Sequence, residues 1–343
     1  MKTYRYFKNL MQGMVVAALA FASPFTGVAL AADEITVAYF LEWPTPNQVA
    51  QIDETFDKEL GVKVNWKSFG SGNDMSAAMA SGDVQISYSQ GLIPFIVAVS
   101  KGLPIKTVGV AVAYAEADNC VVSDSAGLDR SSAAAVGKSL KGMKIATPVG
   151  NVTHYKLLKT LEYLGVSTDD VSIVPVSGGN DAAAAFLTDQ VDIGCAFGGP
   201  LNKMLAKGSV LMTGAEQENI GILTFDVISV TNKFADENPD LLVKFLQVTE
   251  DANNSFAQNP NPHWGTLSKA SGMTEDGVKG YLGSSGSFSF PTKDEQLSSV
   301  WMGGTVQKLT KGAADFFVKQ KVISKALSSY DSTIDASFMK KVN

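Results

Sequence analysis

The chain contains little of what metal centres and hydrolytic active sites are built from. Its 343 residues include 2 histidines and 2 cysteines, so a metal site made of His and Cys ligands is not expected. There is no P-loop and no H-E-x-x-H sequence, and the closest approach to G-x-S-x-G, the run GSSGS at 283–287, lacks the final glycine. We therefore predict a protein that is not an enzyme and needs no metal or cofactor.

Positive charge is also scarce. The chain has 28 Lys and Arg against 34 Asp and Glu, a net charge of −6, which argues against nucleic acid or an anionic membrane as a partner. After the first 31 residues, no segment is apolar for long enough to span a bilayer.

The first 31 residues have the pattern of a secretory signal peptide. Three basic residues precede an apolar run at 11–22, and a small-residue stretch ends at Ala31. The apolar run is shorter than the roughly 20 residues of a spanning helix, and Ser23-Pro24 interrupts it, which favours cleavage over membrane anchoring. Cleavage after Ala31 leaves 343 − 31 = 312 residues, and the charge becomes −6 − 3 = −9. This length allows two domains with substantial cores.

Export places the two cysteines in a compartment where disulfides can form. Cys120 and Cys195 are not part of a C-x-x-C pair. One disulfide bridge and two separate buried thiols are both compatible with the sequence.

An internal repeat divides the chain into two similar halves. With a shift of 107 residues, 7 of the 17 residue pairs between 71–87 and 178–194 are identical. Each half has a strand, a Gly-rich turn, a helix that we expect to be capped by Asp74 or Asp181, and a second strand. The repeat could be an evolutionary relic without functional meaning, but two similar lobes also create a cleft between them, where ligands commonly bind.

Further strand and helix patterns precede both repeated units. We expect strands at 35–40 and 144–148, followed by helices at 47–60 and 151–164. Both halves are then βαβαβ units, which favours an α/β fold with mainly parallel sheets. Such sheets bind ligands at the carboxyl ends of their strands.

The remainder of the chain is predicted to return to the first half. The run at 220–230 is typical of a returning strand, and Pro239 marks a helix start. We expect two more helices at 294–309 and 312–320.

The turn at 148–150 is the clearest candidate for an anion site. A strand ends there and a helix begins at Asn151, so first-turn N–H groups point outward at the positive end of the helix dipole. Asn151 and Thr153 add polar groups, and His154 could donate a ring N–H or simply pack against a neighbouring helix. The competing interpretation of Asn151 is an ordinary helix cap.

Other candidate residues follow the remaining strand ends. Glu42 and Trp43 follow the first strand and could receive a cation by charge and stacking, although surface exposure equally explains Glu42. Tyr88 and Gln90 end the third strand of the first half, and Phe197 takes the matching place in the second half. We expect these positions to face the cleft.

Asp226 is the carboxylate to which we give most weight. It interrupts the apolar run LTFDVISV, and a buried carboxylate without a donor costs several kcal/mol. Its partner is either another group of the protein or a ligand ammonium. Anion donors on one side and this carboxylate on the other would select a small zwitterion.

The chain resembles the periplasmic taurine-binding proteins of ABC importers, within the nitrate, sulfonate and taurine solute-binding group. The resemblance runs from about Ile35 to Tyr330 and is carried by the runs ITVAYF, MASGDVQIS, THYKLL and TFDVISV. It implies a type II periplasmic binding protein fold, with two α/β lobes joined by two crossover strands. The implied lobes are 33–118 plus 222–343, and 119–221.

The resemblance also implies a function. We expect a monomeric periplasmic receptor that captures taurine and delivers it to an ABC permease and its ATPase. Asn151, Thr153 and His154 are the implied sulfonate-side residues, and Asp226 is the implied amine partner.

One departure from the family pattern bears on the ligand. Familiar members often have Trp-x-Pro after the last strand of the second lobe, whereas this chain has Phe197-Gly198-Gly199-Pro200. Hypotaurine, isethionate, an aminophosphonate or another small sulfonate therefore stay open as ligands, with isethionate less favoured because it has no amine for Asp226.

Two enzyme classes are the alternatives. Pyrimidine-synthesis enzymes of thiamine metabolism share the implied fold, but they carry a cysteine-rich motif that this chain lacks. A secreted hydrolase would need a nucleophile and a base in a recognisable arrangement, and the sequence shows none.

Overall fold

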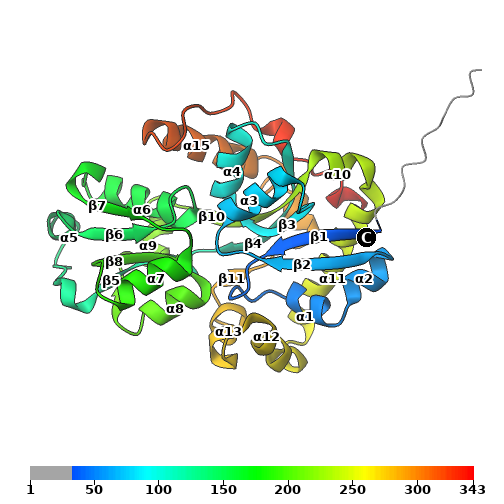
Figure 1. The fold of residues 1–343 in the computed structure, drawn as a ribbon, viewed down its shortest axis with the longest axis horizontal. Coiled ribbons are helices and arrows are strands. Elements are labelled where there is room, and N and C mark those ends of the chain that lie inside the picture. Colours follow the sequence, from blue (N-terminus) through cyan, green and yellow to red (C-terminus); the bar gives the residue numbers. More distant parts are fainter. Residues whose placement is uncertain (1–32) are drawn as a thin grey trace, which may run out of the picture. The chain divides into compact units, whose positions relative to one another are not determined.

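The computed structural model describes residues 33–343. The predicted signal peptide, 1–31, lies outside the described residues. Within 33–343 the chain forms two β-sheets with helices packed around them (Figure 1). None of the helices in this part of the chain is both long and apolar enough to cross a membrane.

The first sheet has six strands in the order β11-β4-β10-β3-β1-β2. The strands are β1 (Glu34–Tyr39), β2 (Lys63–Ser68), β3 (Ile86–Gly91), β4 (Ile105–Tyr114), β10 (Thr224–Thr231) and β11 (Phe288–Ser289). β1 pairs in parallel with β2 and β3, whereas β10 is antiparallel to β3 and β4. β3 is buried along its whole length, as expected of a strand covered on both faces.

The second sheet has five strands in the order β7-β6-β8-β5-β9. The strands are β5 (Asp118–Ser123), β6 (Lys144–Thr147), β7 (Ser172–Pro175), β8 (Ile193–Phe197) and β9 (Gly208–Val210). β6 pairs in parallel with β7 and β8, and β5 is antiparallel to β8 and β9. The chain therefore leaves the first sheet between β4 and β5 and returns to it at β10.

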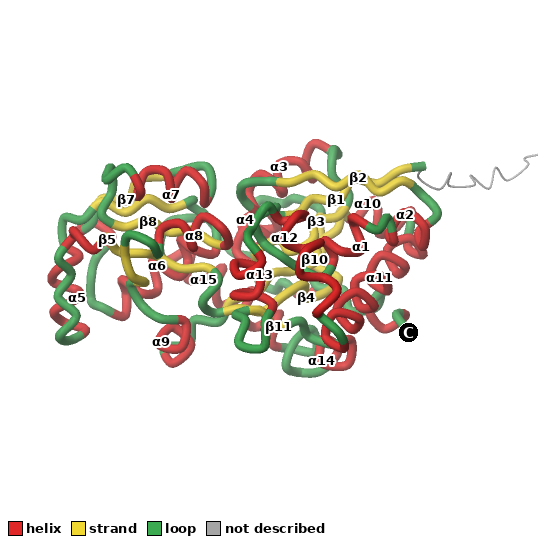
Figure 2. The backbone as a smooth tube through the Cα atoms, turned by 90° about the horizontal axis from the view of Figure 1, so that it is seen from below, coloured by secondary structure: helices red, strands yellow, loops and turns green. Residues whose placement is uncertain are grey.

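Helices fill the connections, and Figure 2 distinguishes them in red from the yellow strands. Between β1 and β4 they are α1 (Asn47–Ile52), α2 (Thr55–Leu60), α3 (Gly72–Ser81) and α4 (Leu92–Ser100). Between β5 and β10 they are α5 (Ala133–Leu140), α6 (Val152–Tyr163), α7 (Gly179–Leu187), α8 (Gly198–Met204) and α9 (Gly214–Asn219). After β10 they are α10 (Asn232–Glu237), α11 (Pro239–Gln258), α12 (Trp264–Ser271), α13 (Glu275–Leu282), α14 (Lys293–Leu297) and α15 (Thr305–Lys319).

The topology repeats as the sequence predicts. The order β2-β1-β3-β10 in the first sheet corresponds to β7-β6-β8-β5 in the second, and the last strand of each set is antiparallel. The shift of 107 residues brings α3 onto α7 and β3 onto β8. The predicted α/β class with two βαβαβ halves and two crossover strands is confirmed, while the exact lobe boundaries stay a prediction.

Several local predictions about helices are wrong. The helix predicted over 47–60 is two helices, α1 and α2, because the chain turns at Glu54, whose φ of 55° is left-handed. The helices predicted at 294–309 and 312–320 are instead α14 and the continuous α15. The helical conformation is interrupted before Thr305, at Gly304, whose φ of 158° suits only glycine. Gly312 instead lies inside α15, where a glycine lowers helix stability by about 1 kcal/mol relative to alanine.

The predicted aspartate caps are also wrong. Asp74 and Asp181 lie in the first turns of α3 and α7, where a negative charge is favourable beside the helix dipole. The N-cap of α3 is Ser71, whose hydroxyl accepts a hydrogen bond from the Asp74 N–H at 3.2 Å. The N-cap of α7 is Gly178, which has no side chain to accept one.

The two cysteines form a disulfide across the second sheet. Cys120 of β5 lies directly opposite Cys195 of β8 in the strand register, and the structure joins them. Both side chains are buried in an apolar cluster with Ile145, Leu157 and Ile193.

Candidate functional site

A small cavity lies where the two halves of the repeat meet. It has a volume of about 20 Å³ and is lined by Phe40, Trp43, Gly91, Pro94, Tyr114, Asp118, Asn151, Val152, Phe197 and Asp226. These residues come from strand ends and helix starts of both halves and from the two crossover strands. The cavity is therefore in the cleft that the repeat predicts, although its volume suits about one water molecule.

Asp226 is buried on one wall of the cavity with both carboxylate oxygens hydrogen-bonded. Oδ1 accepts from the Tyr114 hydroxyl at 2.7 Å, and Oδ2 accepts from the Ser89 hydroxyl at 2.8 Å. Burial raises the pKa of Asp226 to about 8, while the two hydroxyl donors oppose this and the nearby charge of Asp118 adds to it. The hydrogen-bond partners of the Asp226 carboxylate are therefore two neutral hydroxyl groups of the protein, and neither is a cation.

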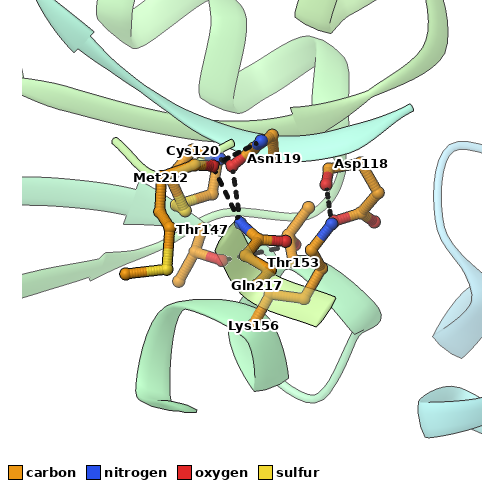
Figure 3. Close-up of a disulfide and its surroundings, with 9 residues drawn as sticks. Asp118, Asn119, Cys120, Thr147, Thr153, Lys156, Met212 and Gln217 are labelled. Atoms are coloured by element: carbon orange, nitrogen blue, oxygen red, sulfur yellow. Dashed lines mark hydrogen bonds between the residues drawn. A yellow bond between two sulfur atoms is a disulfide. The ribbon is translucent and has the colours of Figure 1, made fainter. Parts of the chain in front are cut away.

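Asp118 is a second buried carboxylate on the same cavity. It is 2% exposed, and its Oδ1 has no hydrogen-bond partner. Burial raises its pKa, and the positive charge of Lys156 opposes this shift. Lys156, on α6, donates from its ammonium to the main-chain carbonyl of Ala115 at 2.6 Å. It also donates to the main-chain carbonyl of Asp118 itself (Figure 3).

Asn151 contributes unpaired side-chain N–H groups to the lining of the cavity. It takes the N-cap position of α6, as predicted, but its side chain makes no bond to that helix. Its Oδ1 instead accepts from the Gly72 N–H, at the start of α3, at 3.2 Å. Its Nδ2 is buried without a partner, so this amide can donate to a bound anion.

Aromatic rings cover the remaining wall. The indole of Trp43 packs edge-on to Tyr114 and Phe197, with ring centroids 5.0 and 5.8 Å apart. Trp43 Nε1 donates to the Ser89 hydroxyl at 3.0 Å, the same hydroxyl that donates to Asp226. Phe197 also packs on Phe40, with centroids 5.0 Å apart. The cavity is thus lined by polar side chains and by aromatic rings.

Five of the nine predicted site residues lie outside the lining of this cavity. Both carboxylate oxygens of Glu42 are 3.1 Å from the Lys203 ammonium on α8. Gln90 is bonded within the protein, since its Nε2 donates to Ser76 Oγ at 2.7 Å and its Oε1 accepts from Ser229 Oγ at 2.5 Å.

The other three are Tyr88, Thr153 and His154. Tyr88 lines a separate cavity of about 10 Å³ behind Trp43. The Thr153 hydroxyl lies 3.5 Å from that of Thr147 (Figure 3). His154 Nδ1 accepts from the Gly150 N–H at 3.2 Å, and its ring packs against Phe317. Burial lowers the pKa of His154 to about 4, so the ring is neutral at pH 7.

Sequence reasoning missed Asp118 and Tyr114. Asp118 begins an apolar strand, a position where an acidic residue is ordinary, whereas Asp226 interrupts one.

The Phe-Gly-Gly-Pro sequence permits a close backbone approach between the halves. Gly198 has a φ of 61°, and a Cβ there would lie 2.2 Å from the main-chain oxygen of Glu42. A Cβ on Gly199 would lie 1.9 Å from Glu42 Oε2. These glycines let the start of α8 pack on the loop after β1.

A larger hollow lies outside this cleft. Its volume is about 690 Å³, and it is bordered by the crossover segments at 113–115 and 223–225 and by the chain at 287–309. Its wall includes Leu223 and Val300, both exposed, but it does not bring together the polar residues described above. Among residues 33–343, no cluster of three or more His, Cys, Asp or Glu side chains is arranged to hold a metal ion.

Two sheets of matching strand order, joined by crossover strands around a central cavity, define the periplasmic binding protein fold, which similar solved structures share. The family model described as "NMT1/THI5 like" matches residues 44–262. The chain belongs to this NMT1/THI5-like family.

Two curated relatives are similar over most of their length. The chain is 29% identical to the taurine-binding periplasmic protein of Escherichia coli (strain K12) over 332 residues, which cover 95% of this chain and 98% of that protein. It is 26% identical to a putative aliphatic sulfonates-binding protein of Bacillus subtilis (strain 168) over 291 residues, 84% of this chain and 81% of that protein.

Two solved structures illustrate the range of proteins with this fold. The alkanesulfonate-binding protein SsuA from Xanthomonas axonopodis pv. citri, bound to MOPS, has a TM-score of 0.72 at 21% identity and covers 89% of this chain and 98% of its own. The desulfurization enzyme DSZB has a TM-score of 0.62 at 14% identity and covers 90% of this chain and 98% of its own. At these identities the likeness concerns the fold alone.

Proposed function

We propose that the protein is a periplasmic solute-binding protein of an ABC importer and that it captures taurine in the cleft. One observation carries the proposal: the same small cavity is lined by the carboxylates of Asp226 and Asp118 and by Asn151, whose buried side-chain N–H groups have no partner. Carboxylates accept from an ammonium, and an amide N–H donates to a sulfonate oxygen. The extensive similarity to a taurine-binding periplasmic protein supports this choice.

The apolar wall suits the short carbon chain between the two charges. Trp43 and Phe197 provide ring surface in the lining of the cavity. Because a cavity of about 20 Å³ holds about one water molecule, a ligand of seven heavy atoms requires its walls to separate. We infer that the lobes, at 33–118 plus 222–343 and at 119–221, open for entry and close on the ligand by a hinge motion of the crossover segments.

The function implies further partners and a location. A monomeric receptor that closes on its ligand would present the closed form to an ABC permease and its ATPase, after export through the signal peptide predicted at 1–31. No nucleic acid partner is proposed, in keeping with the net charge of −6.

Hypotaurine, isethionate, an aminophosphonate and other small sulfonates are the alternative ligands. Hypotaurine keeps the amine and differs only at the acid. Isethionate lacks the amine, and its hydroxyl would leave Asp226 and Asp118 without a cation.

An enzyme on the same fold is the second class of function. The likeness to DSZB shows that the fold also occurs in an enzyme. Incubation of the purified protein with each candidate sulfonate, followed by product analysis, separates the classes, because a receptor binds stoichiometrically and yields no product.

The direct test measures ligand affinity by isothermal titration calorimetry. Taurine, ethanesulfonate, isethionate and ethylamine are compared in the wild-type protein, Asp226→Asn and the surface control Asp124→Asn. We expect taurine to bind best and Asp226→Asn to weaken it about 10- to 100-fold, the effect of losing one hydrogen bond to a charged group. Ethanesulfonate should change far less. If the wild-type protein binds none of these sulfonates, the proposed function is wrong.

A further inference from the structure

We propose that Asp118 is an ammonium-binding residue of the cleft and that, together with Asp226, it makes the receptor select solutes that carry an amine. This inference rests on the proposed function and adds the group that determines its ligand class. Three features support it: the position of Asp118 in its crossover strand, its hydrogen bonding and the charge balance of the cavity.

The two aspartates have similar positions in the two crossover strands. Asp118 begins β5 and Asp226 lies near the start of β10, and these are the corresponding antiparallel strands of the two sheets. Asp118 lies opposite Phe197 and Asp226 opposite Gly91. Phe197 and Gly91 are each the last residue of a parallel strand and the N-cap of the following helix. Each crossover strand therefore delivers one aspartate to the same cavity.

The hydrogen bonding of the two carboxylates differs. Asp226 has a donor on each oxygen, Tyr114 and Ser89. Asp118 Oδ1 is buried and has none. Of the two carboxylates, Asp118 is thus the one that still needs a donor, and it lines the cavity in which the ligand is proposed to bind.

Lys156 does not meet this need. Its ammonium donates to the main-chain carbonyls of Ala115 and Asp118, so it holds the crossover segment in place. Its positive charge partly offsets the negative charge of the Asp118 carboxylate. Asp118 interacts electrostatically with the Lys156 ammonium, the Asp226 carboxylate and the Tyr114 hydroxyl. With both carboxylates ionised, these groups carry one net negative charge.

An ammonium completes this arrangement. It adds one positive charge and three N–H donors, enough to reach both carboxylates. A sulfonate without an amine would leave Asp118 unpaired and would add a second negative charge. Burial of an unpaired carboxylate is costly, which explains why the site would discriminate against such a ligand.

The test is Asp118→Asn in the full mature protein, with Asp124→Asn as a matched control. Asp124 follows β5 on the surface and is exposed. We expect Asp118→Asn to weaken taurine about 10- to 100-fold and to leave ethanesulfonate within about threefold of the wild-type affinity. The control should leave both affinities unchanged.

A second readout separates ligand binding from a structural role. Because the substitution removes a buried charge, the melting temperature of the ligand-free variant should stay level or rise, while the increase produced by taurine shrinks. A melting temperature lower by more than about 5 °C would mark Asp118 as structural and overturn the inference. An unchanged taurine affinity, or equal losses for taurine and ethanesulfonate, would also overturn it.

The wild-type protein provides a test that does not depend on any variant. We expect it to bind taurine at least about tenfold more tightly than ethanesulfonate, since one charge-assisted bond has this effect. Equal affinities would overturn the role of Asp118 but leave a sulfonate receptor intact. Binding of neither ligand would instead refute the proposed function.

Discussion

The backbone N–H of Gly199 donates a hydrogen bond to the backbone carbonyl of Glu42 at 3.1 Å. Glu42 follows β1, in the first half of the repeat, and Gly199 lies in the first turn of α8, in the second half. The Glu42 carboxylate also pairs with Lys203 one turn further along α8. The two halves are therefore in main-chain contact beside the cavity, and side chains on the two glycines would obstruct that contact.

Gly198→Ala should weaken taurine binding. A Cβ at this position would lie 2.2 Å from the Glu42 carbonyl oxygen, and backbone atoms cannot move aside as a flexible side chain can. We expect at least a tenfold loss of affinity, measured by calorimetry, together with a larger radius of gyration by X-ray scattering in the presence of ligand.

Gly127→Ala is the control for backbone strain. Gly127 has a φ of 66°, close to that of Gly198, but a Cβ added there would have no atom within 4 Å. Both substitutions should cost about 1 kcal/mol of stability, and only Gly198→Ala should affect affinity. Equal affinities in the two variants would mean that this contact does not contribute to closure.

Taurine affinity should rise as the pH increases from about 6 to about 8. Burial raises the pKa of Asp226 to about 8, and the same cause raises the pKa of Asp118. At a pH below these pKa values the carboxyl groups are protonated, so binding of the ligand ammonium must release protons. Each pH unit is expected to change the affinity by up to about tenfold. Calorimetry in buffers of different ionisation enthalpy measures the number of protons released on taurine binding. Binding to the Asp226→Asn variant should release fewer protons. A flat pH profile would contradict the assignment of the ammonium to these carboxylates.

The ligand-free protein should show the opposite trend in stability. The Asp226 carboxyl ionises at a pKa near 3.8 in the unfolded chain and at about 8 in the fold. Between these values the folded state holds more protons, so the contribution of Asp226 to the free energy of unfolding falls as the pH rises. Chemical denaturation at pH 5 and pH 8 should show a smaller difference for Asp226→Asn than for the wild-type protein.

His154→Phe is expected to affect stability more than binding. The neutral ring accepts from the Gly150 N–H, and its burial lowers the His154 pKa to about 4. Loss of this acceptor leaves a buried donor unpaired, at a cost of about 1–3 kcal/mol, which urea denaturation would measure. We expect taurine affinity to change less than about threefold. A tenfold loss would instead favour direct contact between His154 and the ligand.

The Cys120–Cys195 disulfide should stabilise the second sheet. It closes a sequence separation of 75 residues, so its removal should cost about 2–4 kcal/mol. The double variant Cys120→Ala/Cys195→Ala is compared with the wild-type protein by denaturation, with and without reductant. Reductant should lower the stability of the wild-type protein only, and thiol titration of that unreduced protein should find no free thiol. Detection of two thiols would contradict the bridge.

Much of the fold is predictable because the relevant signals are short-range. Alternation of apolar strands with amphipathic helices indicates the α/β class, and the repeat indicates two similar sheets. The helix errors occur where one backbone conformation overrides a periodic pattern, as at Glu54 and Gly304. Periodicity reports which face of a helix is apolar, but it carries little information about a single left-handed residue.

The site was predictable only in part for a different reason. Trp43, Asn151, Phe197 and Asp226 were predicted because each lies at a strand end or interrupts an apolar strand. All four line the cavity, and their contact with a ligand stays a prediction. Glu42 has the same local signal, yet its carboxylate meets Lys203, 161 residues away in the sequence. Which polar group receives which partner depends on distances that no local pattern encodes.

The order of strands and helices, the repeat and the scarcity of catalytic side chains are all properties of the linear chain, since residue order and composition alone determine them. The cavity is not. It arises when two crossover strands bring Asp118 and Asp226 together and a pair of glycines lets the halves approach, and burial then changes the chemistry of both carboxylates. A low local dielectric and the choice of hydrogen-bond partners exist only in the folded chain.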